Sequence, residues 1–180
     1  TGSALSIHAI AGLGGWLTLV AMGVSYRLLA MFMLAPDLEG RRPRAVLALG
    51  ATALALAVLG APVTILLGAS PDVVLALAGL AGLVALGLYG ADIAHLYRDR
   101  KRRKVELNSY MAGLALASLA AASLLFIVLL ALDRLSDGVA GVVFLVAFGW
   151  LSGLGLSKLY KIVPFLTWLE CYGPVLGKIA

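Results

Sequence analysis

The sequence contains little charge and few side chains that take part in catalysis. Of its 180 residues, 13% are charged, and there are only 2 histidines and 1 cysteine. Because Cys171 is the single cysteine, a disulfide within the chain and a metal cage of cysteines are excluded, and we expect this thiol to have no role. The motifs of hydrolases, kinases, dinucleotide-binding proteins and zinc proteins are also absent.

Apolar residues dominate instead. They make up 62% of the chain, and the mean hydropathy is +1.04, which is outside the range of soluble domains. A helix needs about 20 apolar residues to cross a bilayer. Runs of this length lie at about 4–25, 45–68, 73–96, 109–132 and 138–158, and the first is too long for a signal peptide. We therefore predict an all-α, polytopic integral membrane protein with five transmembrane helices in a single domain, 1–180.

The positions of the basic residues predict the orientation. If the five spans alternate in direction, all of the 14 Lys and Arg residues except Arg134 fall on one side of the membrane. The positive-inside rule then places the N-terminus outside and the C-terminus inside, and we expect a bacterial-type inner membrane. The basic run at 98–104 needs no nucleic acid to explain it, and the expected contacts are the lipid bilayer and anionic lipids at its inner face.

Two distant segments share one pattern. The segment 15–17 reads Gly-Trp-Leu and is followed by a Tyr-Arg pair at 26–27. The segment 149–151 reads the same, and a Tyr-Lys pair follows at the same spacing at 160–161. The first and fifth spans would then be a parallel repeat with a period of four helices, unlike the inverted repeats of many carriers.

Beyond each Tyr-plus-cation pair we expect the chain to leave the membrane and continue along its inner interface, at about 27–35 and 162–172. Pro164 is expected to break the helix in the second copy, and Pro62 to kink or end the regular part of the second span. The tryptophans Trp16 and Trp150 lie inside their spans, so packing between helices is the expected role for both.

Small residues predict close contacts between helices. Gly149 and Gly153 lie one turn apart, which lets a neighbouring helix approach closely, and helix 3 of the five is similarly rich in glycine. Such Gly-rich faces also favour homo- or hetero-oligomers.

One histidine lies over a bare strip of backbone. His8, Gly12 and Gly15 are spaced so that they share one helix face. An imidazole above two glycines suits a flat macrocycle bound through His8, with haem b as the candidate cofactor. The same face equally suits close packing of another helix.

The stretch 6–15, which leads to Tyr26 and Arg27, resembles the second transmembrane helix of haem-copper oxidase catalytic subunits, especially the cbb3 type, and related haem-containing membrane proteins such as the NnrS group. The resemblance covers about 30 residues, plus the weaker copy at 149–161. It implies a four-helix structural period and makes His8 a candidate axial ligand of haem iron on the outer side.

The chain departs from that family in several ways. It has no His-x-His pair and no copper-binding histidines, and Val142 stands where the second copy would carry its ligand. An oxygen-reducing haem-copper centre therefore cannot be built from these residues. The chain would supply one axial ligand, and the other would come from a second subunit or be left open.

A second candidate site lies at the inner end of the third span. Asp92 and His95 are three residues apart on a helix, so they can pair locally. A carboxylate inside a membrane is a proton-site hypothesis by default, although a structural ion pair beside the basic run is the favoured interpretation. His95 is about one membrane thickness from His8, so the two cannot share a haem.

Three functions remain open. The first is haem-linked redox or gas-responsive chemistry in the membrane, with a candidate role in electron transport. The second is a cofactor-free accessory or assembly subunit of a membrane complex. The third is a small membrane transporter, which the scarcity of polar residues in the spans makes the weakest of the three.

Overall fold

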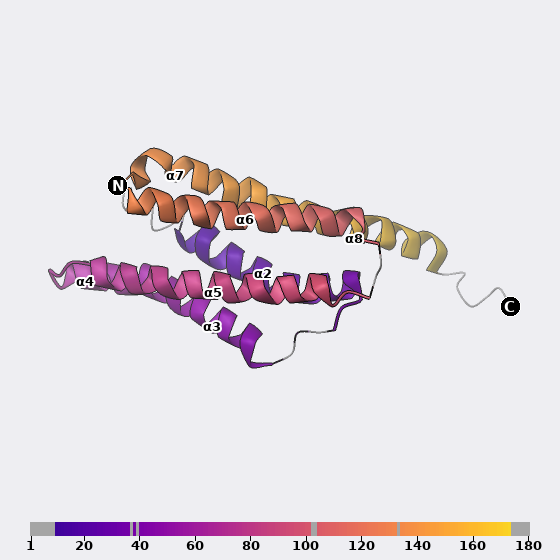
Figure 1. Ribbon diagram of the computed structural model, residues 1–180, viewed down its shortest axis with the longest axis horizontal. Helices are drawn as coiled ribbons and strands as arrows, with labels where there is room; N and C mark the ends of the chain where they lie inside the picture. Colours follow the sequence, from indigo (N-terminus) through magenta and orange to yellow (C-terminus); the bar gives the residue numbers. More distant parts are fainter. Residues whose placement is uncertain (1–9, 37, 39, 102–103, 133, 174–180) are drawn as a thin grey trace. The chain divides into compact units, whose positions relative to one another are not determined.

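The computed structural model describes residues 10–36, 38, 40–101, 104–132 and 134–173, and within these ranges it contains helices and no strands (Figure 1). The elements, in chain order, are η1 (Ile10–Leu17), α2 (Thr18–Met33), α3 (Arg41–Ala55), η2 (Leu56–Gly60), α4 (Ala61–Leu66), α5 (Asp72–Arg98), α6 (Leu107–Ala131), α7 (Leu135–Phe144), η3 (Leu145–Ser152) and α8 (Gly153–Tyr172). Those labelled η are π-helical, with wider turns than an α-helix.

Consecutive elements join into long helices. Among the described residues, 5 helices are long and apolar enough to cross a membrane: Ala11–Met33, Arg41–Leu66, Asp72–Arg98, Leu107–Ala131 and Asp137–Tyr172. The all-α class and the number of candidate spans predicted from the sequence are therefore confirmed. The orientation and the relation between the first and fifth spans stay predictions.

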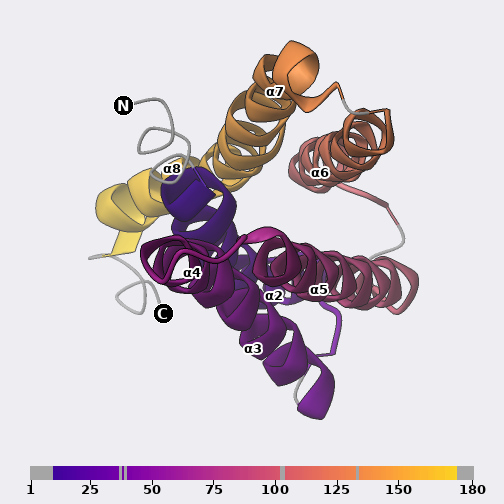
Figure 2. The same cartoon turned by 90° about the vertical axis from the view of Figure 1, so that its left-hand side faces the viewer.

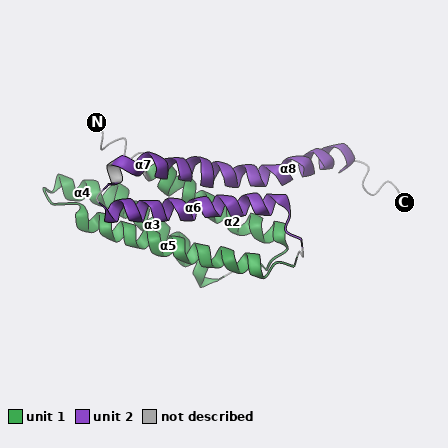
Figure 3. Ribbon diagram, turned by 45° about the horizontal axis from the view of Figure 1, so that its top comes forward, with its two compact units in different colours: residues 1–103 green, residues 104–180 purple. Residues whose placement is uncertain are grey.

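The chain divides into two compact units, residues 1–103 and residues 104–180 (Figure 3). The first unit contains three of the candidate spans, and the second contains two. The single domain expected from the sequence stays a prediction.

In the first unit, α3 packs along α5, and α2 contacts both of them; Figure 2 shows these three helices nearly end on. Their contact is lined by apolar side chains that have almost no exposed surface, such as Met22, Leu29, Val46 and Leu96. Small residues, including Ala85, are buried in the same unit. They permit the short distances between helices on which packing in lipid depends.

In the second unit, α6 packs against α7, η3 and α8. Two glycines of the fifth span face α6 directly. A Cβ atom at Gly149 would come within 2.6 Å of the Ser118 Cβ, and one at Gly153 within 3.3 Å of the Ala115 Cβ. The close helix approach predicted for Gly149 and Gly153 is therefore confirmed.

The expected break at Pro164 is wrong, because α8 continues through this proline to Tyr172. Pro164 has no N–H group to donate to the carbonyl of Tyr160, so the helix continues with one backbone hydrogen bond fewer. In the first span, α2 likewise continues past Arg27 and ends at Met33, followed by Leu34, whose φ of 51° is left-handed. Placement of 27–35 and 162–172 at the interface stays a prediction.

The irregularity expected around Pro62 is confirmed. The π-helical turn η2 ends at Gly60, and α4 begins at the next residue with the proline in its first turn. A proline in the first turn lacks only an N–H group that the new helix does not use. The wider turn before it accommodates the ring without ending the span.

Candidate functional site

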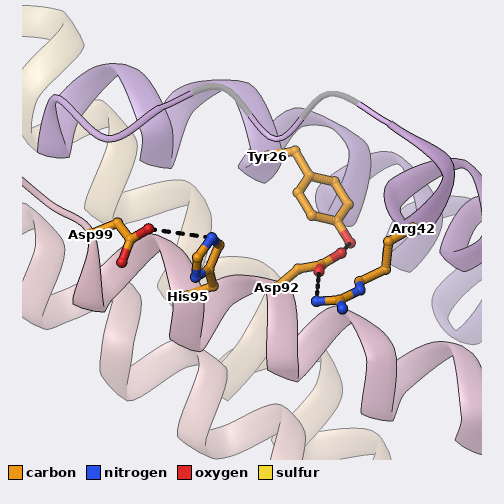
Figure 4. A network of polar contacts seen from close by, with 5 residues as sticks. All are labelled: Tyr26, Arg42, Asp92, His95 and Asp99. Atoms are coloured by element: carbon orange, nitrogen blue, oxygen red, sulfur yellow. Dashed lines mark hydrogen bonds and ion pairs between the residues drawn. The ribbon is translucent and has the colours of Figure 1, made fainter.

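A buried carboxylate is the centre of a polar cluster in the first unit. Asp92 lies on α5 and is 1% exposed. The Tyr26 hydroxyl, from α2, donates a hydrogen bond to its Oδ2 atom over 3.0 Å. Figure 4 shows the tyrosine ring pointing from its own helix toward the carboxylate. The contact links the first and third candidate spans.

The other carboxylate oxygen faces a cation. The Nη1 atom of Arg42, in the first turn of α3, lies 3.5 Å from Oδ1 of Asp92 (Figure 4). The side chain of Arg42 is 62% exposed, whereas that of Asp92 is 2% exposed. The pair therefore connects a buried negative charge with a surface cation. Because the two atoms are 3.5 Å apart and Arg42 is mostly exposed, we expect this ion pair to stabilise the fold less than a buried bidentate ion pair would.

A second hydrogen-bonded pair lies beside the first. The hydroxyl oxygens of Ser25 and Tyr89 are 2.6 Å apart. Ser25 donates its single proton to the Met22 carbonyl over 2.7 Å, so Tyr89 is the donor in the contact between the hydroxyls. The rings of Tyr26 and Tyr89 meet edge to face, with centroids 5.4 Å apart. The four side chains thus form one continuous contact between α2 and α5.

The local helix geometry explains this arrangement. Ser25 and Tyr26 are adjacent on α2, and Tyr89 and Asp92 are three residues apart on one face of α5. When α2 and α5 pack in one particular register, Ser25 meets Tyr89 and Tyr26 meets Asp92 at the same time. Because an unpaired carboxylate in lipid is costly, the cluster favours this register over one shifted by a turn.

His95 is not part of the cluster. Its Nε2 atom lies 3.3 Å from Oδ2 of Asp99, and both side chains are substantially exposed (Figure 4). No hydrogen bond or ion pair joins it to Asp92 within the described structure. The pairing that the spacing of Asp92 and His95 allows is therefore not formed, because Asp92 faces α2 and α3 while His95 faces the end of its own helix.

The haem site expected from the sequence falls partly outside the described residues, which begin after His8. The two glycines of its bare strip differ. Among the described residues, no atom lies within 4 Å of a Cβ built on Gly12, but a Cβ on Gly15 would overlap the Leu54 side chain of α3. Within the described structure the strip is thus open at Gly12 and covered at Gly15 by the end of a leucine side chain.

The remaining residues that the sequence singled out are Cys171 and the two tryptophans. Cys171 is exposed. Groups of three or more His, Cys, Asp and Glu side chains that could hold a metal ion are absent from the described part of the chain. Trp150 is fully buried, as expected, but Trp16 is 69% exposed, so the packing role predicted for Trp16 is wrong.

Sequence reasoning missed the role of Tyr26, which the Tyr-plus-cation pattern placed at the membrane surface. The sequence did contain a signal for this contact. Ser25, Tyr26 and Asp92 are polar residues in otherwise apolar spans, and each lies a few residues before a basic residue, Arg27 or Arg98. Such residues in a membrane usually find one another, because lipid offers no hydrogen bonds.

The arrangement holds a carboxylate between a hydrogen-bond donor and a cation. The Tyr26 hydroxyl contacts one oxygen of Asp92, and the Arg42 guanidinium lies near the other.

Comparison with protein-family models, with curated proteins and with solved structures finds no match to this chain.

Proposed function

We propose that this protein is a multipass membrane protein that binds and releases a proton at Asp92. The observation that supports the proposal is the burial of this carboxylate, 1% exposed within a helix long enough to cross the membrane, with a tyrosine hydroxyl at 3.0 Å. Ionisable groups inside membranes are rare because they are costly, and they commonly mark proton relays.

Arg42 supplies the connection to water. Its guanidinium is mostly exposed and lies 3.5 Å from the carboxylate, so a proton arriving from the aqueous side reaches Asp92 beside this cation. When the carboxylate takes up the proton, Arg42 loses its partner but remains solvated. Tyr26 then donates to a neutral acid or accepts from it, since a hydroxyl can do either.

Carbodiimide labelling tests the proposal directly. Dicyclohexylcarbodiimide enters the membrane and adds to protonated carboxyl groups in apolar surroundings. We expect mass spectrometry of the labelled, membrane-embedded protein to find the adduct on Asp92, in a yield that rises as the pH falls.

The matched controls come from the same helix. Asp92→Asn should abolish the adduct, and Asp99→Asn, at the exposed end of α5, should leave it unchanged. If Asp92 stays unlabelled at every pH at which the protein remains folded, the carboxylate is a permanently ionised structural partner of Arg42 and the proposal is wrong.

A second function, haem-linked redox or gas-responsive chemistry, is supported by a different observation. Gly12, which is open among the described residues, comes four residues after His8 in the sequence and lies in a π-helical segment, and π-helical turns are frequent at functional sites. A haem there would supply electron transfer or gas binding. In this proposal His8 would bind the iron, and Gly12 would permit the close approach of the ring, whereas Leu54 would have to leave Gly15 for the ring to extend there.

An absorption spectrum tests this second function. Protein extracted from membranes of haem-supplied cells should show a Soret band, which His8→Ala removes. The other histidine is the matched control, because His95→Ala should leave the band intact. A wild-type sample without the band would count against a haem role. If the carbodiimide label were absent as well, the accessory-subunit function would be the remaining proposal.

A further inference from the structure

An open groove in the second unit lies between the beginning of α6 and the middle of α8. Its volume is about 970 Å³. Most of its wall is apolar, and the side chains concerned are Leu107, Met111, Leu156, Leu159, Val163 and Pro164. Figure 3 shows α8 extending past the first turn of α6. The mostly apolar wall of the groove suits a hydrocarbon chain.

The groove is also lined by Tyr160 and by three further polar side chains. Glu106, directly before α6, and Lys161, on α8, form an ion pair and are each about one-third exposed. Asn108 is 1% exposed, and neither its side-chain nitrogen nor its oxygen has a hydrogen-bond partner in the described structure. A buried amide with no partner is unusual in a folded protein, because both of its groups have lost water without replacement. Its place in the groove wall indicates a ligand with polar atoms at this level.

The charges define the chemistry of that ligand. A positive Lys161 and a negative Glu106 side by side match a headgroup that carries both signs. A phosphate can accept hydrogen bonds from the Lys161 ammonium and the Asn108 amide, while a primary ammonium donates to the Glu106 carboxylate. Each partner of the existing ion pair thereby keeps an opposite charge beside it, so little electrostatic energy is lost when the headgroup enters.

We propose that this groove binds one phospholipid with a zwitterionic, primary-amine headgroup, of the phosphatidylethanolamine type. One acyl chain lies along the apolar wall, and the headgroup bridges Glu106 and Lys161 beside Asn108. A purely anionic headgroup fits less well, because its second negative group would face Glu106. The site is independent of Asp92 and of His8, so the proposal stands or falls separately from the proposed functions.

The test compares headgroups with identical acyl chains. Purified protein in mild detergent is titrated with phosphatidylethanolamine, phosphatidylcholine and phosphatidylglycerol, and bound lipid is counted by native mass spectrometry. We expect one phosphatidylethanolamine to bind about tenfold more tightly than phosphatidylcholine, whose methylated ammonium cannot donate a hydrogen bond. Equal binding of all three lipids, or a preference for phosphatidylglycerol, would overturn the proposal without any mutation.

Variants then locate the site. Glu106→Gln should remove the preference for phosphatidylethanolamine, and Lys161→Gln should weaken all three lipids by about tenfold. The matched controls, Glu170→Gln on the exposed part of α8 and Arg134→Gln at the opposite end of the unit, should change neither. Unchanged lipid selectivity in Glu106→Gln would contradict the assignment. A protein dimer that persists in phosphatidylethanolamine and dissociates in Lys161→Gln would also contradict it, because the groove would then bind a second copy of the chain.

Discussion

The first and fifth spans share a sequence pattern but bury different residues of it. In the first span the tryptophan is 69% exposed and the tyrosine 8% exposed. In the fifth span the tryptophan is 0% exposed and the tyrosine 57% exposed. Trp16 and Tyr160 thus lie on the surface, while Trp150 and Tyr26 lie in contact with other parts of the protein. The same residue types at the same spacing therefore have opposite exposure in the two spans.

The buried stripes show how the two spans differ. The buried residues that follow the shared pattern are Thr18, Met22, Ser25 and Tyr26 in the first span, and Trp150, Leu154, Ser157 and Lys158 in the fifth. When the two copies are aligned on Gly-Trp-Leu, the second stripe begins two residues earlier. Two residues correspond to about 200° around an α-helix. The two spans therefore present nearly opposite faces of the same pattern to the interior.

The neighbouring helices explain the difference. In the first unit, Asp92 of α5 offers a partner that draws Tyr26 inward. In the second unit, α6 presents Ser118 and Ala115 to the glycines of the fifth span, and the equivalent tyrosine is left on the groove wall. A shared pattern thus supplies a polar contact in one place and part of a proposed lipid site in the other.

The two tryptophans give the largest expected contrast. Trp150→Ala should destabilise the protein by about 3–5 kcal/mol, because it removes a large, fully buried side chain. Trp16→Ala, its counterpart in the first span, should change stability by less than about 0.5 kcal/mol. Reversible unfolding in mixed detergent measures both. Similar losses in the two variants would show that the spans bury the same face after all.

The two tyrosines give the opposite contrast. Tyr26→Phe should cost about 1–3 kcal/mol, because the buried Asp92 carboxylate loses its hydroxyl donor. Tyr160→Phe should have an effect below about 0.5 kcal/mol, since this side chain is mostly exposed. The same unfolding assay applies. A larger effect for Tyr160 than for Tyr26 would contradict the described cluster.

Glycine substitutions sharpen the comparison further. Gly149→Ala should cost about 1–2 kcal/mol, because the new methyl group would overlap Ser118 of α6. Gly12→Ala has open space, so it should be neutral or stabilising by up to about 1 kcal/mol. If haem binds at His8, Gly12→Ala should nevertheless lower the Soret absorbance. Stability and absorbance would then move in opposite directions.

The smallest effect is expected at Arg42. Arg42→Gln should cost less than about 1 kcal/mol, because its guanidinium is mostly exposed and lies at the limit of contact with Asp92. A loss of stability as large as that of Trp150→Ala would mean that the pair is more deeply buried than described.

Several features could be predicted because they depend on composition and local chemistry. The five apolar runs correspond to five helices, with ends that differ by several residues. Pro62 marks an irregular turn, and Gly149 and Gly153 permit close packing. The pairing of Tyr26 with Asp92 could not be predicted in the same way, because it depends on how α2 and α5 are rotated about their axes.

The sequence by itself determined that this chain forms long apolar helices, since each run must satisfy its backbone hydrogen bonds internally to exist in lipid. It did not determine which face of each helix turns inward. A helix that is apolar on all sides carries no hydrophobic stripe to set its rotation. Only tertiary contacts decided that, through Asp92 beside Tyr26 in one unit and Ser118 beside Gly149 in the other, because in lipid close packing and polar pairing replace the hydrophobic effect.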